Sequence, residues 1–140
     1  MRFWESSAIV PLLLEEPRTA AVVDIYEQDN ALVVWALTEV EIASALARRD
    51  REGLDAEVLV RARRELLKLV DRWGEIAALS PVRSRALRLV NTHTIRAADS
   101  LQLAAALVAC EERPDAMPFV CLDDRLRDAA RREGFPVLPA

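Results

Sequence analysis

Four acidic side chains stand at positions where their carboxylates could act together. Two of them end short apolar segments, and the other two lie in segments with helical patterning. The four are Glu5, Glu41, Asp99 and Asp123. Carboxylate oxygens are the ligands that Mg²⁺ and Mn²⁺ prefer, and four carboxylates can neutralise two such ions. The set therefore predicts an acidic metal site.

Other catalytic chemistries find little support in the residue types. The chain has three glycines, and none belongs to a phosphate-binding loop. His93 is the only histidine, which excludes a His-rich zinc site and leaves no serine-hydrolase motif. Cys110 and Cys121 form no CxxC pair, so we expect two reduced thiols. Any catalysis must come mainly from carboxylates, hydroxyls and arginines.

Glu5 and Asp123 each end an expected strand and precede an expected helix. Ligands of open parallel sheets bind beyond the carboxyl ends of the strands, which favours a site there. Each residue also has a local interpretation. Glu5 could be an exposed acid beside a helix N-terminus, and Asp123 or Asp124 could be an ordinary N-cap.

Glu41 and Asp99 lie on expected helices. Glu41 follows Thr38 by three residues, and local sequence alone favours a capping box in which Glu41 bonds back to the helix start. Asp99 lies in a helix that is apolar on most sides, beyond its expected first turn. A buried carboxylate is costly unless it is paired or binds a metal. We favour the metal interpretation for Asp99, with an ion pair to Arg96 as the alternative.

The elements that must position these residues alternate between strands and helices. Apolar runs predict strands at residues 2–5, 32–36, 76–79, 119–122 and 135–138. Helical spacing and caps predict helices at residues 6–14, 18–28, 38–52 and 55–73, from Ser80, from 94 or 95 to 112, and at 125–133. The alternation predicts an α/β fold, with a parallel sheet covered by helices on both faces.

Composition is consistent with one domain spanning residues 1–140. Hydrophobic residues make up 52% of the 140 residues, enough for a sizeable core. No apolar run approaches membrane-spanning length, so we expect a cytoplasmic protein with no membrane contact. The net charge of −4 argues mildly against a nucleic-acid binder, although local patches matter more than the total.

Four segments resemble the PIN domain family, and in particular the toxin ribonucleases of VapC type. In the family's order they are RFWESSAIV at residues 2–10, TEVEIASAL at 38–46, IRAADSLQLA at 95–104 and FVCLDDRL at 119–126. The resemblance assigns the family's acidic quartet to Glu5, Glu41, Asp99 and Asp123, and its small hydroxyl residue to Ser6 or, preferably, Ser7. It implies an endoribonuclease that uses Mg²⁺ or Mn²⁺, with RNA as substrate, a homodimer and a cognate antitoxin.

One position departs from the family pattern, because its first acid is normally Asp and here is Glu5. The extra methylene moves the carboxylate by about 1.5 Å, and Mg²⁺ demands near-ideal geometry. Two hypotheses follow: an active ribonuclease, with Arg96 as a candidate phosphate contact, or a scaffold that binds RNA or antitoxin but cleaves poorly. A phosphoacceptor receiver domain ranks last, because Lys68, the only lysine, lies in the middle of a helix.

Overall fold

The computed structural model describes all residues from Met1 to Ala140 and contains a central five-stranded sheet. The strands are β1 (Arg2–Trp4), β2 (Leu32–Trp35), β3 (Gly74–Ile76), β4 (Phe119–Val120) and β5 (Val137–Leu138). All pairings are parallel, in the order β3-β2-β1-β4-β5. Strand β1 is central, because Phe3 lies in register with Val33 of β2 and with Phe119 of β4.

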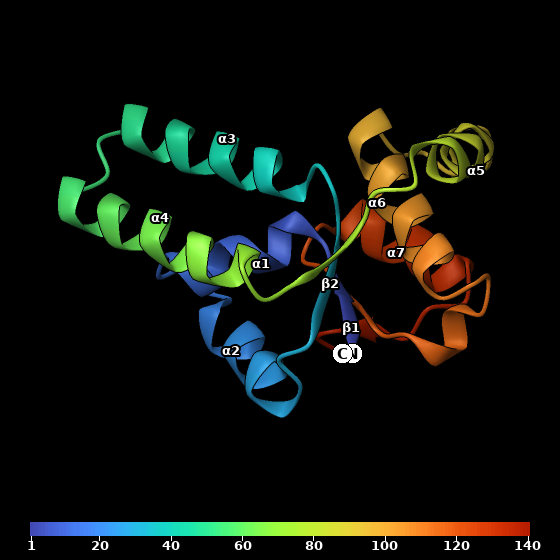
Figure 1. Cartoon of the computed structure of the whole chain (residues 1–140), viewed down its shortest axis with the longest axis horizontal. Coiled ribbons are helices and arrows are strands. Elements are labelled where there is room, and N and C mark those ends of the chain that lie inside the picture. Colours follow the sequence, from blue (N-terminus) through green and yellow to red (C-terminus); the bar gives the residue numbers. More distant parts are fainter.

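Seven α-helices cover the two faces of the sheet (Figure 1). They are α1 (Ser6–Leu13), α2 (Thr19–Gln28), α3 (Thr38–Arg51), α4 (Ala56–Val70), α5 (Leu79–Thr92), α6 (Ala97–Ala109) and α7 (Asp124–Arg132). A short 3-10 helix, η1 (Pro114–Ala116), precedes β4. None of the helices combines the length and apolarity needed to cross a lipid bilayer.

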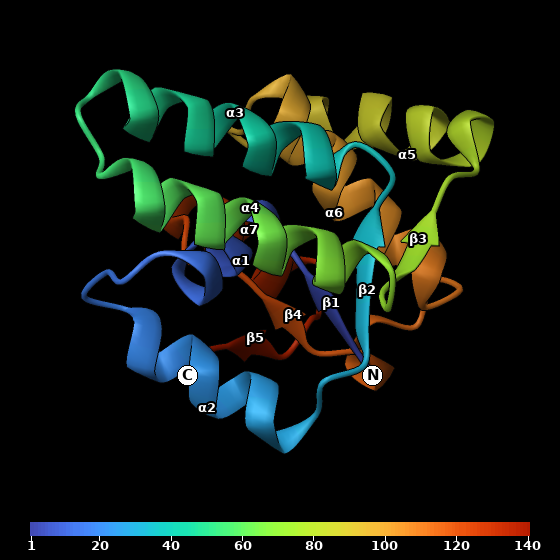
Figure 2. The ribbon, with the colours of Figure 1, turned by 60° about the vertical axis from the view of Figure 1, so that its left-hand side comes forward.

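Each face of the sheet has its own apolar core. Successive strand residues point to opposite faces, so Phe3 joins the core under α5, α6 and α7, whereas Trp4 joins the core under α1 to α4. Figure 2 shows α3 and α4 running side by side as a pair that extends beyond the sheet. The expected α/β architecture, a parallel sheet with helices on both faces, is confirmed.

The expected bounds of the helix that carries Asp99 are wrong at both ends. Helix α6 begins at Ala97 rather than at residue 94 or 95, because Arg96 is extended, with φ −79° and ψ 165°. The helix ends at Ala109, and Glu111 and Glu112 follow with positive φ angles of 52° and 59°. Asp99 consequently lies in the first turn of α6, not beyond it.

The segment after α4 also differs from the expectation. Helix α4 ends at Val70 and not at the expected residue 73, and Gly74 begins β3, so the strand expected at residues 76–79 lies earlier in the chain. Helix α5 begins at Leu79 after Ala78, and no side chain caps it, so Ser80 is not its N-cap. These shifts leave the order of elements as expected.

Candidate active site

Glu5 leaves the sheet directly after β1 and turns into the protein. Glu5 is only 4% exposed, so the interpretation of this residue as an exposed acid is wrong. Glu5 is the N-cap of α1, and its Oε2 accepts a hydrogen bond from the Ser7 amide at 3.0 Å. The Ser7 hydroxyl donates to the same oxygen. Glu5 thus supplies the side-chain cap of α1.

Ser6 joins two of the four acids. Its Oγ lies 2.7 Å from Glu5 Oε1 and 2.9 Å from Glu41 Oε2. A hydroxyl has one proton to donate, so it cannot donate to both carboxylates at once. Without a cation, the two contacts are satisfied together only if one carboxyl is protonated. Ser6, rather than the preferred Ser7, makes this bridge.

Ser7 and Cys121 connect the ends of β1 and β4. The Leu122 amide donates to Ser7 Oγ at 2.9 Å, and the Cys121 thiol donates to Glu5 Oε2 at 3.3 Å. Burial, followed by the nearby Glu5, raises the pKa of the Cys121 thiol. Cys121 therefore stays protonated and acts as a hydrogen-bond donor to the acid.

Glu41 is held by tertiary contacts and not by a capping box. The N-cap of α3 is Leu37, and no side chain caps this helix, so the local interpretation is wrong. Gln102 of α6 donates through Nε2 to Glu41 Oε2 at 2.6 Å and to Thr38 Oγ1 at 3.0 Å. Gln102 is fully buried, and its amide oxygen accepts no hydrogen bond.

Asp99 and Asp123 line one cavity together with Ala98, Asp124 and two arginines, Arg96 and Arg125. Asp123 Oδ1 accepts from the Leu126 amide at 2.9 Å, which confirms that it is the N-cap of α7. Asp99 is half-buried and forms no ion pair with Arg96.

The acids influence one another electrostatically. Burial, opposed by hydrogen bonds from both serines and from Cys121, raises the pKa of Glu5. Burial and, more weakly, the charge of Asp99 raise the pKa of Glu41. Burial and then the charge of Asp123 raise the pKa of Asp99. Glu5, Glu41, Asp99 and Asp123 therefore form a chain of neighbouring acidic groups at the edge where the strands end.

This donor set suits a hard divalent cation, because the ligands are carboxylate oxygens and a cation would relieve their mutual repulsion. In the present arrangement no group of three or more His, Cys, Asp or Glu side chains is placed to hold one metal ion. In this arrangement Glu5 is hydrogen-bonded to the two serines, and Asp123 caps α7.

Sequence reasoning did not predict that Gln102, Cys121 and Arg127 contribute to the site. Gln102 follows Asp99 by three residues, so the two lie on neighbouring positions of α6, and an amide in an apolar run is a detectable signal. Arg127 is 7% exposed and donates to the carbonyl oxygens of Cys121 and Pro139 at 2.7 and 2.6 Å. Arg127 thereby fixes the backbone just before Asp123. No local sequence pattern predicts this role for Arg127.

Comparison with known proteins identifies the class. A family model for the PIN domain matches residues 3–132, and the chain belongs to this family. Two curated relatives are both named Ribonuclease VapC35, from Mycobacterium tuberculosis strains CDC 1551 / Oshkosh and ATCC 25618 / H37Rv. Each is 35% identical to this chain, with 99% of this chain and 96% of the relative covered. The crystal structure of FitAcB from Neisseria gonorrhoeae shares the fold, with a TM-score of 0.66 and 18% identity over 98% of this chain and 96% of that chain.

Proposed function

We propose that this protein is a Mg²⁺- or Mn²⁺-dependent endoribonuclease and the toxin of a toxin–antitoxin pair. The observation that carries the proposal is the line of coupled carboxylates at the end of the parallel strands, with Glu5 and Glu41 joined through Ser6. The similarity of this chain to relatives named as ribonucleases, over nearly the full length of both chains, supports RNA as the substrate.

The metal would be held by Glu5, Glu41, Asp99 and Asp123. When bound, it supplies an acidified water for attack on a phosphodiester and stabilises the leaving oxygen. The other residues set the geometry of the acids. Gln102 and Ser6 orient Glu41, while Ser7 and Cys121 orient Glu5. Arg96 is exposed in the same cavity as Asp99, where it can contact an RNA phosphate.

A cleavage assay tests this proposal. The purified chain is incubated with total RNA in Mg²⁺, and the new RNA ends are sequenced. We expect cleavage at a defined set of sites, loss of cleavage in EDTA, and recovery when Mg²⁺ or Mn²⁺ is restored in excess. Full cleavage in EDTA would contradict the metal mechanism, because no histidine-based route is available in a chain whose only histidine is His93.

A cognate antitoxin and a homodimer belong to the same proposal. Large apolar side chains are exposed close to the acids: Leu37 is 49% exposed and Val40 is 64% exposed, on either side of Thr38 and just before Glu41. Exposed apolar groups beside a polar site are typical of interaction surfaces. Co-expression with the neighbouring reading frame, followed by co-purification and a mass measurement, tests both partners.

One observation favours a second function, in which the chain binds RNA or an antitoxin with little or no cleavage. Glu5 already accepts hydrogen bonds from Ser6, Ser7 and Cys121. A carboxylate engaged in this way is less available to a metal. The same assay separates the two functions, because a scaffold retains RNA or antitoxin binding and releases no new RNA ends at any Mg²⁺ concentration.

A further inference from the structure

A continuous groove leads away from the acidic cluster, between α7 and the segment that joins α5 to α6. It consists of three cavities that share lining residues. The cavity at Asp99 and Asp123 shares Arg96 and Arg125 with a second cavity. The second cavity shares residues 93–95 and Arg125 with a third one, of about 240 Å³, that continues along α7 to Arg132.

The end of the groove next to the acids carries two unpaired cationic side chains. Arg96 and Arg125 are exposed, and neither takes part in any ion pair of the structure. Both line the cavity that contains Asp99 and Asp123, so they lie close to the acidic cluster. Their guanidinium groups are free to bind a planar anion such as phosphate, which arginine contacts through two parallel hydrogen bonds.

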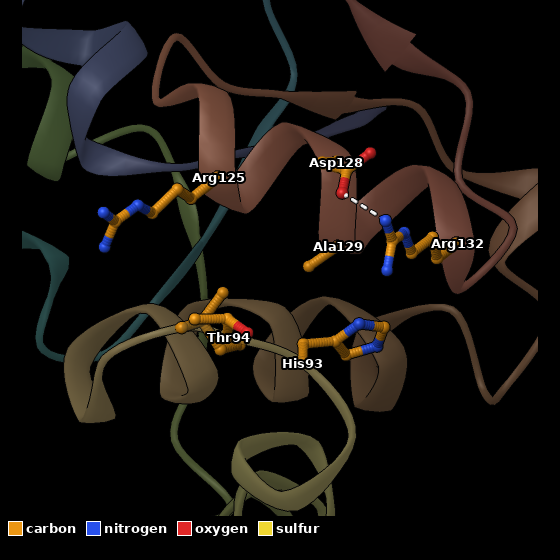
Figure 3. Close-up of a pocket in the computed structure, with 7 residues that line it drawn as sticks. His93, Thr94, Arg125, Asp128, Ala129 and Arg132 are labelled. Carbon is orange, nitrogen blue, oxygen red and sulfur yellow. Dashed lines mark ion pairs between the residues drawn. The ribbon is translucent and has the colours of Figure 1, made fainter.

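The far end of the groove holds a third arginine in a weak ion pair. Arg132 Nη2 lies 3.1 Å from Asp128 Oδ2, and both side chains are more than half exposed. Figure 3 shows this pair on α7, with His93 and Thr94 across the cavity and Arg125 extending away from the pair. Exposed pairs of this kind contribute little free energy, so an incoming phosphate can compete with Asp128 for Arg132.

We propose that this groove binds single-stranded RNA beside the scissile phosphodiester, with Arg125 on a backbone phosphate next to the acidic cluster and Arg132 on a phosphate further along. The inference rests on the proposed ribonuclease function and assigns the path of its substrate. The groove is lined mainly by polar and charged residues and has arginines at both ends, as expected for a surface that follows a phosphate backbone. The lining contains three arginines and four aspartates, so the phosphate contacts would come from individual arginines and not from a net positive charge.

Two substitutions of opposite expected sign test the groove. Binding of a fluorescent single-stranded RNA of about 12 nucleotides is measured by anisotropy in EDTA, so that cleavage does not interfere. Arg125→Ala should weaken binding by roughly tenfold and reduce the salt-dependence slope by about 0.7, the loss of one phosphate contact. Asp128→Asn should tighten binding, because it removes a negative charge and releases Arg132.

Arg64→Ala is the matched control, because Arg64 is an exposed arginine of α4, on the opposite face of the sheet. The inference is overturned if Arg125→Ala and Asp128→Asn both bind RNA as Arg64→Ala does, or if the unaltered chain binds no RNA. Cleavage in Mg²⁺ is measured separately on the same proteins. Cleavage without any groove effect refutes the path alone, whereas groove effects without cleavage refute the ribonuclease function alone.

Discussion

The burial of Glu5 opposes the ionisation of its carboxyl group. Its carboxylate lies almost entirely out of water, where an ionised acid is disfavoured. Donors from Ser6, Ser7 and Cys121 offset part of this cost, but the pKa of Glu5 is still raised from its ordinary value of 4.5. Because the unfolded chain loses this proton more readily than the folded one, folding stability falls as pH rises from 4.5 through the folded-state pKa.

Glu5→Gln should therefore stabilise the metal-free protein at neutral pH. The amide keeps the size and an acceptor oxygen for Ser7 but carries no charge to desolvate. We expect the Tm at pH 7 in EDTA to rise by roughly 3–5 °C, the effect of about 1 kcal/mol in a domain of this size. The gain should disappear below pH 4.5. Glu15→Gln, at an exposed glutamate, should show neither effect; a lower Tm for Glu5→Gln at pH 7 would contradict the interpretation.

Glu5→Asp addresses catalysis at the same position. The strand pairing fixes the backbone of β1, so the shorter side chain moves the carboxylate and not the main chain. Asp is also a strong N-cap, and α1 should keep its start. A misplacement of about 1 Å can cost on the order of a hundredfold in rate, so we expect Glu5→Asp to cleave RNA faster and to bind Mg²⁺ more tightly.

The check on Glu5→Asp is the initial cleavage rate of both forms across Mg²⁺ and Mn²⁺ series. Mn²⁺ should help the Glu5 form more than the Asp form, provided that Mn²⁺ accepts less ideal geometry than Mg²⁺. A Glu5→Asp variant that is no faster at any metal concentration would show that Glu5 is already adapted to its site.

At the level of secondary-structure elements, Gln102 connects α3 to α6. Its amide nitrogen reaches Thr38 and Glu41 at the start of α3 from the second turn of α6. The contact fixes Glu41 relative to Asp99, three positions before Gln102 on the same helix. A fully buried amide with two such partners orders both helices, because losing it leaves Glu41 and Thr38 without their donor.

Gln102→Met should lower the free energy of unfolding by about 1–3 kcal/mol. Methionine has nearly the same length and volume, so little of the loss would come from a cavity. Chemical denaturation of both forms measures the change, and Mg²⁺ titration of both forms should show weaker binding by the variant. Gln28→Met, at an exposed glutamine of α2, is the control. Equal stability of Gln102→Met and the unaltered chain would remove Gln102 from this role.

Sequence patterns predicted the elements well where the signal was local and apolar. The apolar residues of β1, β2 and β4 form strands as expected, since buried parallel strands are rich in apolar residues, although β4 ends at Val120 and not at residue 122. The capping box at Thr38 and Glu41 failed because stronger partners come from distant positions, with Ser6 and Gln102 separated from Glu41 by 35 and 61 residues. No local pattern contains such contacts, which exist only after the sheet has formed.

At the level of the whole molecule, parallel pairing brings the site together. Because β1 and β4 are neighbours running in the same direction, Glu5 and Asp123 emerge at one edge of the sheet. Helices α3 and α6 deliver Glu41 and Asp99 to the same edge from the two apolar cores. The acids of four distant segments are therefore positioned by topology, and the groove between α7 and the α5–α6 connection begins where they meet.

Asp99→Asn tests the central claim most directly, because it removes one charge from the acidic cluster while keeping the shape of the side chain. The measurement is the initial rate of RNA cleavage in saturating Mg²⁺, beside Asp50→Asn at an exposed aspartate of α3, with circular dichroism as the check on folding. We predict a folded Asp99→Asn protein whose rate falls by at least about a hundredfold, while Asp50→Asn keeps its activity. A folded Asp99→Asn protein that cleaves as fast as Asp50→Asn would contradict the account.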